Sequence, residues 1–303
     1  MYSNFNCEKF EGIKAIETAP GTSFFLRTLK FAVLIISKFI CCIYEFRKLF
    51  NKIIKMSQFS HELISNFTLL WILFGLVIFV ILLFIRAPYG KHYNIKWGPE
   101  INNKLGWIVM EMPALLICPL TYLSIVDDIF RFESFFIVLW VLHYFNRTII
   151  YPLKIKTKNK KMPILIAASA IFFNLINGLI NGYFLSLINI YDYNLVIIGF
   201  FIFLLGGFIN IQSDDILINL RRENQKYFIP RGGLFNYVSS PNYFGEIMEW
   251  FGFFVMTLNL GTFSFFIWTF VNLVPRAISN HKWYIEKFND YPKERKILIP
   301  KIF

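Results

Sequence analysis

The sequence predicts an all-α, polytopic membrane protein with seven transmembrane helices and an N-terminal interfacial helix. Two observations carry this prediction. Hydrophobic residues make up 56% of the 303 residues and aromatic residues 19%, and the mean hydropathy is +0.52, which is too apolar for an ordinary soluble domain. Apolar runs of about 20 residues, the length that crosses a bilayer, also recur along the chain. Each run must form a helix, because an open strand leaves its backbone groups unsatisfied in lipid.

Seven apolar runs are long enough to span the hydrocarbon core. They lie at 66–86, 106–126, 132–153, 162–187, 194–213, 242–260 and 261–278. An earlier apolar run at 29–46 carries Lys30 and Lys38 and ends in charged residues, so we expect it to lie in the membrane interface. Residues 1–60 therefore form an N-terminal extension, and residues 61–303 form the membrane domain.

The basic residues predict the orientation of the spans. Lys and Arg gather in the loops after the first, third and fifth spans and in the C-terminal tail, whereas the opposite loops hold only Arg131. The basic side, with the C-terminus, should therefore face the cytosol. The net charge of the chain is +12, and its basic residues lie between the apolar runs. This placement favours membrane lipids and a phosphate-bearing ligand as partners and argues against nucleic acid.

The sequence gives no support to a metal site or to a known soluble nucleotide fold. The four cysteines, Cys7, Cys41, Cys42 and Cys118, have neither CxxC nor zinc spacing, and the four histidines have no HxxxH spacing. Neither GxGxxG after a strand nor GxxxxGK[ST] occurs. Any nucleotide must therefore bind without a Rossmann or P-loop fold.

Polar side chains form a stripe on each of four spans, at the spacing of one helical face. The stripes are Tyr144, Arg147 and Tyr151; Asn174, Asn177 and Asn181; Asn210, Asp214 and Arg221; and Asn242, Glu246 and Glu249. Such groups are costly at membrane depth and normally face a protein interior or a wet cavity. The stripes predict a buried polar cavity toward the basic side. For the three asparagines, hydrogen bonding between helices is an equally good interpretation.

Glu111 is a further carboxyl group within a span, and it lies close to Pro113, which removes a backbone donor. Desolvation can keep such a carboxyl group protonated, so that it donates a hydrogen bond. Pairing with a basic residue such as Arg147 is an equal alternative.

Several motifs closely resemble the steroid 5α-reductase family. They are YGKH at 89–92, MEMPAL at 110–115, HYFNRTIIYP at 143–152, INIQSDDIL at 209–217, IPRGGLFNYVSSPNYFGEIMEWFGF at 229–253 and PRAISNHKWYIEKFNDYPKERKILIP at 275–300. They occur in the family's order, and the resemblance covers residues from about 60 to 303.

The resemblance implies a seven-span reductase, of the endoplasmic reticulum, in which NADPH delivers hydride to the β-carbon of a lipid-soluble conjugated enone, most typically a 3-oxo-Δ4 steroid. It implies that Glu111 and Tyr144 are the catalytic pair that hydrogen-bonds the substrate carbonyl. The positions implied to bind the cofactor are Asn210, Asp214, Arg221, Tyr227, Asn242, Glu246 and Tyr284, with Arg147, Tyr151 and His281 in matching motifs beside it. It implies no metal.

Two positions depart from the family pattern. Ser279, Asn280 and His281 stand where the best-studied mammalian members carry consecutive histidines, so Asn280 must make any contact attributed to a histidine there. Phe228 stands where a basic residue is common, which leaves Lys226 or Arg231 to contact a phosphate.

Four alternatives remain. Within the family, one alternative is the trans-2-enoyl-CoA reductase branch, which usually has a ubiquitin-like N-terminal domain and lacks the GExxEW pattern seen at 245–250. Polyprenal reduction is another alternative within the family. Isoprenylcysteine-type methyltransferases share a Pro-x-Tyr-x-Gly element, here at 241–245, but they carry Arg-His before it, where this chain has Ser239 and Ser240. A transporter would explain polar stripes, but the sequence shows no inverted repeat.

Overall fold

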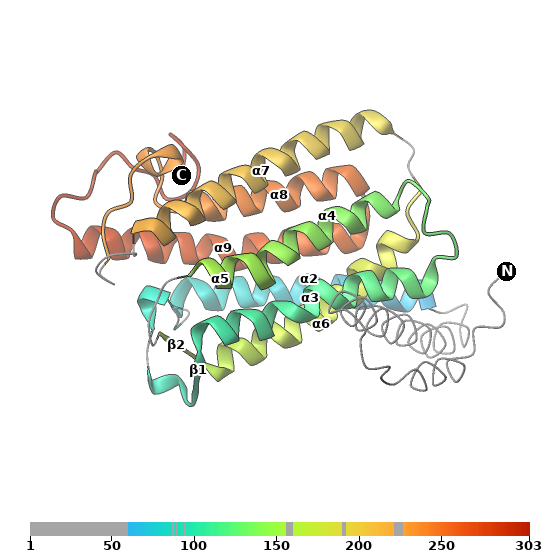
Figure 1. The fold of residues 1–303 in the computed structure, drawn as a ribbon, viewed down its shortest axis with the longest axis horizontal. Coiled ribbons are helices and arrows are strands. Elements are labelled where there is room, and N and C mark those ends of the chain that lie inside the picture. Colours follow the sequence, from blue (N-terminus) through green and yellow to red (C-terminus); the bar gives the residue numbers. More distant parts are fainter. Residues whose placement is uncertain are drawn as a thin grey trace, which may run out of the picture.

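The computed structural model describes residues 60–86, 88, 90–93, 95–155, 160–189, 192–220 and 227–303. These residues form a bundle of long helices (Figure 1). The helices are α2 (Ser60–Phe84), α3 (Asn103–Ile125), α4 (Ser134–Phe145), α5 (Tyr151–Lys154), α6 (Ile164–Ser186), α7 (Tyr193–Leu220), α8 (Pro241–Thr257) and α9 (Leu260–Lys287). The interfacial helix expected at 29–46 lies outside the described residues.

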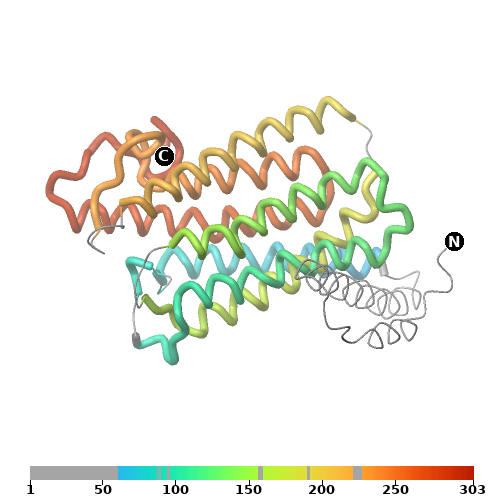
Figure 2. The backbone as a smooth tube through the Cα atoms, in the orientation of Figure 1, coloured from blue at the N-terminus to red at the C-terminus, as the bar shows by residue number. Residues whose placement is uncertain are grey.

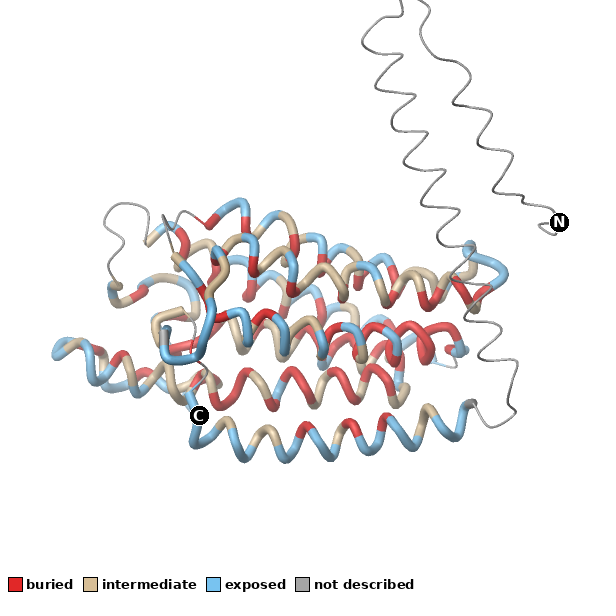
Figure 3. The backbone as a smooth tube through the Cα atoms, turned by 90° about the horizontal axis from the view of Figure 1, so that it is seen from below, coloured by how far each residue is buried: buried red, intermediate tan, exposed pale blue. Residues whose placement is uncertain are grey.

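Five helical stretches in the described part of the chain are long and apolar enough to cross a membrane. They are His61–Phe84, Asn103–Ile125, Ser134–Lys154, Ile164–Ser186 and Tyr193–Leu220, and they match the first five expected spans. Helices α8 and α9 occupy the last two expected ranges but are not among the five, so the count of seven spans stays a prediction. Buried positions lie on the faces where helices meet (Figure 3). Helices α2 and α7 leave many large apolar side chains exposed, as expected of helices that face apolar lipid tails.

The helices pack mainly in pairs that run along one another (Figure 2). Helix α7 packs along α8, α3 along α6, and α2 along α9. Helix α4 packs on α3 and also reaches α8 through its side chains. Where these helices meet, Phe136, Trp140, Trp250 and Phe253 are fully buried. The aromatic core therefore joins the α3–α6 pair to the α7–α8 pair through α4.

Glycines allow α7 and α8 to approach closely. A Cβ atom at Gly199 would lie 2.6 Å from the carbonyl oxygen of Gly252, and one at Gly206 would lie 2.6 Å from that of Gly245. In the other direction, a Cβ atom at Gly252 would lie 2.6 Å from the carbonyl oxygen of Gly199, and one at Gly245 would lie 2.6 Å from that of Gly206. Small residues of this kind let membrane helices come into backbone contact. This packing brings the polar stripes of α7 and α8 together.

A short two-stranded sheet was not predicted from the sequence. Strand β1 (Glu100–Asn102) pairs antiparallel with β2 (Lys161–Pro163), and Glu100 lies opposite Pro163. The sheet joins the segment before α3 to the segment before α6. It lies at the same end of the bundle as the C-terminus (Figure 1), outside the five candidate spans. Three-residue strands are too short to show the alternation of apolar and polar residues from which strands are predicted.

Candidate functional site

Arg147 lies at the centre of an ionic cluster formed with α7 and α8. Its Nη1 atom is 3.2 Å from Asp214 Oδ2, and its Nη2 atom is 3.8 Å from Glu246 Oε2. Asn242 Nδ2 donates to Asp214 Oδ1 at 3.0 Å. Asn210 Nδ2 donates to the carbonyl of Asn242 at 2.9 Å and to Glu246 Oε2 at 3.3 Å. The charges are largely buried and each has a partner, as burial requires.

Two aromatic rings hold the guanidinium of Arg147 in place. Its Cζ atom lies 5.1 Å from the ring centre of Trp107 and 5.1 Å from that of Tyr151, distances at which cation–π attraction operates. Arg147 belongs to a π-helical turn, Asn146–Ile150, between α4 and α5. Such turns are rare, and they occur frequently at functional sites.

Glu111 faces the same cluster from α3. Asn174 Nδ2 donates to the carbonyl of Met110 at 2.7 Å and reaches Glu111 Oε2 at 3.4 Å. Glu111 also interacts electrostatically with Arg147 and Glu246. Asn174 therefore links α6 to α3 and holds the carboxyl group.

The other two asparagines of α6 are buried without reaching that carboxyl group. Asn181 Nδ2 donates to the carbonyl and to the Oδ1 atom of Asn177, each at 2.9 Å. Both side chains are fully buried. The stripe on α6 thus supplies a hydrogen bond between helices at Asn174 and a bond within α6 at Asn181.

Tyr144 lies on α4 with a buried ring. Its ring centre is 5.0 Å from that of Trp140 and 5.9 Å from that of Trp250. Tyr144 interacts electrostatically with Glu111 and with Glu246. Side chains from α3, α4, α7 and α8 therefore converge on one buried polar region.

The residue types in this region suit two kinds of chemistry. A phenol and a carboxyl group that face one region can donate hydrogen bonds to a carbonyl oxygen. The carboxylates and amides of α7 and α8 can bind hydroxyl and amide groups of a ligand. The described residues contain no group of three or more His, Cys, Asp or Glu side chains placed to hold a metal ion.

Comparisons with known proteins decide the family. A family model described as 3-oxo-5-alpha-steroid 4-dehydrogenase matches residues 160–303. Steroid 5-alpha-reductase DET2 of Gossypium hirsutum is 40% identical over 258 residues, which cover 80% of this chain and 99% of the relative. The DET2 protein of Arabidopsis thaliana is 40% identical over 263 residues, with 82% and 100% covered. The 3-oxo-5-alpha-steroid 4-dehydrogenase 1 of Homo sapiens is 38% identical over 228 residues, with 72% and 87% covered.

The chain belongs to the steroid 5α-reductase family. The predicted resemblance is thereby confirmed. As a member of the steroid 5α-reductase family, the protein is an oxidoreductase that acts on CH–CH groups.

Two expected cofactor residues of this reductase lie in a second cluster, built from aromatic rings and lysines. Lys160 Nζ donates to the hydroxyl of Tyr227 at 3.3 Å, and the Tyr227 ring lies 5.1 Å from that of Trp283. Lys91 Nζ lies 3.9 Å from the ring centre of Tyr284 and 4.9 Å from that of Trp283. Trp283 thus connects Tyr227 to Tyr284.

His281 lies in a network with the C-terminal segment of the reductase. Its Nδ1 atom is 2.5 Å from Ser239 Oγ, which also lies 2.6 Å from the hydroxyl of Tyr291. The neighbouring Asn280 donates to Ser240 Oγ at 3.4 Å. Arg221, also expected to bind the cofactor, lies outside the described residues.

Several side chains in these clusters have no role in the site predicted from the sequence. Trp107 precedes Glu111 by four residues, a spacing that puts both on one face of α3 and that could have drawn attention to it. Lys91 lies within the YGKH motif, which was a second available signal. Asn174, in contrast, belonged to a predicted polar stripe, but its bond to the segment that carries Glu111 could not be predicted, because that bond depends on how α6 packs on α3.

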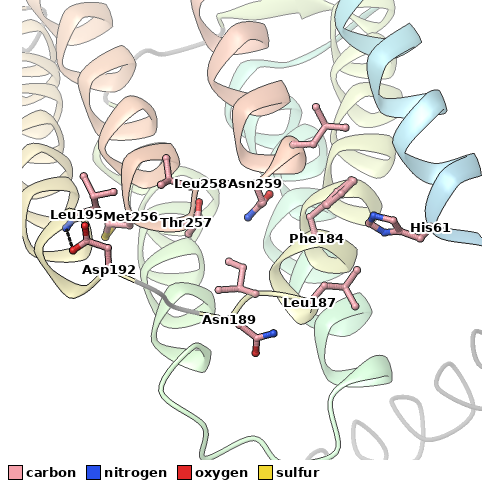
Figure 4. A pocket seen from close by; sticks show the side chains of 12 residues that line it. His61, Phe184, Leu187, Asn189, Asp192, Leu195, Met256, Thr257, Leu258 and Asn259 are labelled. Carbon is pink, nitrogen blue, oxygen red and sulfur yellow. Dashed lines mark hydrogen bonds between the residues drawn. The ribbon is translucent and has the colours of Figure 1, made fainter.

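A separate cavity of about 370 Å³ lies at the opposite ends of the helices (Figure 4). Phe184 at the end of α6, Leu195 at the start of α7 and Met256 at the end of α8 line it, together with His61 and Asn259. None of the site residues expected from the sequence lines this cavity. The ionic cluster of Arg147 lies instead beside α5 and the start of α8, which are toward the end of the bundle that carries the C-terminus (Figure 1).

Proposed function

We propose that the protein uses NADPH to reduce the C=C bond of a conjugated enone, namely a 3-oxo-Δ4 steroid. The buried side chains of Glu111, Tyr144 and Arg147 lie close enough to interact electrostatically, and this observation carries the proposal. The names of the relatives support the substrate class, since they are steroid 5-alpha-reductases and 3-oxo-5-alpha-steroid 4-dehydrogenases.

The catalytic pair acts on the carbonyl oxygen of the enone. When NADPH is bound, it supplies the hydride that the β-carbon accepts. As negative charge develops on the carbonyl oxygen, Tyr144 and a protonated Glu111 donate hydrogen bonds to it, and each donor is worth about 2 to 4 kcal/mol in such sites. Asn174 orients Glu111. Tyr144 or water supplies the proton that the α-carbon takes up.

The two clusters fit the two ends of a dinucleotide. The largely buried acceptors of Asp214 and Glu246 suit the hydroxyl and carboxamide donors of the nicotinamide half. Lysines and aromatic rings around Tyr227 and Tyr284 suit phosphate and the adenine face. Asn210, Asn242, Arg147 and Tyr151 complete the proposed cofactor site, together with Arg221 and His281.

The division of the chain into apolar spans and basic loops indicates how the substrate and the cofactor reach the site. A lipid-soluble substrate reaches Glu111 and Tyr144 laterally through the bilayer, whereas the basic loops attract the polyanionic cofactor from the water. By the positive-inside rule the end with the C-terminus faces the cytosol. We propose the endoplasmic reticulum as the membrane.

A substrate panel tests this function against its alternatives. Membranes that contain the protein are incubated with NADPH and a Δ4-3-ketosteroid, a polyprenal or an enoyl-CoA, and products are analysed by mass spectrometry. We expect only the steroid to gain two hydrogen atoms. Reduction of the polyprenal or the enoyl-CoA alone, or methyl transfer from S-adenosylmethionine, would contradict the proposal.

A further inference from the structure

A buried pair of ionisable side chains, His143 and Glu249, lies next to the proposed catalytic tyrosine. His143 Nδ1 is 2.8 Å from Glu249 Oε1, and the two side chains are only 5% and 6% exposed. His143 belongs to α4 and Glu249 to α8. The pair therefore connects the helix that carries Tyr144 to the helix pair that carries the proposed cofactor site.

The surrounding residues leave the pair little room to move. The His143 ring packs edge-on against Trp250, with ring centres 4.6 Å apart. A Cβ atom at Gly207 of α7 would lie 3.3 Å from Glu249 Oε1, so the glycine makes space for the carboxylate. The contact is thus enclosed by α4, α7 and α8.

Among the described residues, the pair is one of two ionic contacts that α4 and the π-helical turn after it make with α8, and the two contacts lie on consecutive helical turns. Arg147 follows His143 by four residues and approaches Glu246, which precedes Glu249 by three. Tyr144 lies directly after His143, and the two rings meet edge-on with centres 5.1 Å apart. Any shift of α4 along α8 would move the Tyr144 hydroxyl relative to a ligand held by α7 and α8.

We propose that His143 and Glu249 form a positioning pair that holds Tyr144 in register with the cofactor side of the site. This inference rests on the proposed function, because it concerns the alignment of Tyr144 with a bound enone and NADPH. The pair does not touch the reacting atoms. It acts through Tyr144, since a small displacement of a catalytic group costs a large factor in rate.

Two substitutions at one position separate positioning from charge and packing. Glu249→Gln keeps an acceptor for His143, whereas Glu249→Leu has a similar volume and no acceptor. In purified protein with NADPH and a Δ4-3-ketosteroid, we expect Glu249→Leu to lower kcat about 100-fold while the KM for NADPH stays within about twofold. We expect Glu249→Gln to restore most of the rate. An equal loss in both variants, or a loss confined to the KM for NADPH, would overturn the positioning role.

A double-mutant cycle with Tyr144 provides the decisive comparison. If the pair acts through the Tyr144 hydroxyl, Glu249→Leu should cause no further loss of single-turnover rate in the Tyr144→Phe background. A loss of the same size in both backgrounds would reveal a merely structural role and overturn the proposal. His143→Leu serves as the second variant if Glu249→Leu does not fold, and the same result is expected.

Two controls keep the outcomes distinct. Thr257→Val removes another buried hydrogen bond of α8, the 2.8 Å contact with Thr262. Thr257 is the last residue of α8, about two helical turns beyond Glu249, so this variant should leave kcat unchanged. If the wild-type protein does not reduce the steroid, the proposed function itself is refuted. Wild-type reduction combined with additive losses would refute only the positioning pair.

Discussion

Arg147 Nη1 lies 3.2 Å from Asp214 Oδ2, and this ion pair joins the stretch that carries Tyr144 to α7. It divides the polar region into two sides. Glu111 and Asn174 approach from the α3–α6 pair, whereas the partners of Arg147 come from the α7–α8 pair. A reaction between a lipid ketone and a dinucleotide requires such a meeting point.

Tyr144→Phe removes one proposed donor to the carbonyl oxygen and keeps the ring that packs against Trp140. We expect kcat for enone reduction to fall by about 100- to 1,000-fold, with the melting temperature in detergent almost unchanged. Steady-state kinetics and a thermal melt check both parts. Turnover at the wild-type rate would remove Tyr144 from the proposed reaction.

Glu111→Gln tests the second donor, because an amide keeps the shape of the carboxyl group but is a weaker acid. We expect a loss in kcat of about 100-fold or more, with little change in the KM for NADPH. Asn174 still has the carbonyl of Met110 as a partner, so the helix packing should survive. A variant that raises only the KM for NADPH would place Glu111 on the cofactor side instead.

Asp214→Asn tests the cofactor side, and the next residue supplies a matched control. Asp214 is buried beside Arg147, whereas Asp215 is half-exposed and pairs with Lys154 at 2.8 Å. We expect Asp214→Asn to raise the KM for NADPH by about tenfold or more, the cost of one charged hydrogen bond. Asp215→Asn should leave it unchanged. Equal effects from both variants would contradict the assignment of Asp214.

Gly206→Ala tests the close packing of α7 on α8, with Gly207→Ala as its control. The added Cβ at Gly206 would lie 2.6 Å from the Gly245 carbonyl oxygen, whereas the nearest atom to a Cβ at Gly207 is Oε1 of Glu249, 3.3 Å away. We expect Gly206→Ala to destabilise the fold by about 1 to 3 kcal/mol and Gly207→Ala by less. Thermal melts of both variants in one detergent measure the difference.

Arg131 and Glu133, which lie outside the candidate spans, make the stability of the fold depend on pH. Arg131 Nε donates to Glu133 Oε2 at 2.8 Å, and its guanidinium also bonds to the carbonyls of Ser186 and Ile188. The hydrogen bond from Arg131 lowers the pKa of Glu133 below its ordinary value. The resulting stability is present above the ordinary glutamate range of roughly pH 4 to 5 and is lost as the pH falls through the lowered value.

Melting temperatures between neutral and acid pH check that dependence. Wild-type protein should lose more stability than Glu133→Gln as the pH falls below about 5. Since the pair is partly exposed, the difference should be small, at about 1 kcal/mol or less. Identical pH profiles for the two proteins would contradict the contribution of Glu133.

The sequence allowed the helices to be located closely, because hydropathy and length alone decide which segments can cross lipid. The third expected span at 132–153 and the observed Ser134–Lys154 nearly coincide. The π-helical turn inside that stretch was not predictable, since no residue type marks it. The pairing of β1 with β2 was likewise missed, because it depends on how two loops meet at one end of the bundle.

The members of the polar region could be predicted from their spacing, but their contacts could not. The stripe that contains Asn242 and Glu246 pointed to one face of a helix. The partners of that face on other helices could not be predicted. They depend on the glycine contacts between α7 and α8 and on the packing of α4. His143 and Glu249 illustrate the difference, because they are 106 residues apart in the sequence and form a direct bond.

Transfer of a labelled hydride tests the proposed reaction most directly. Purified protein is incubated with a Δ4-3-ketosteroid and NADPH that carries deuterium at the transferable position, and the product is examined by NMR and mass spectrometry. We expect deuterium on the β-carbon of the saturated ketone, with the rate of transfer sharply reduced in Tyr144→Phe and in Glu111→Gln. Product without deuterium at that carbon, or full transfer in both variants, would contradict enone reduction at this site.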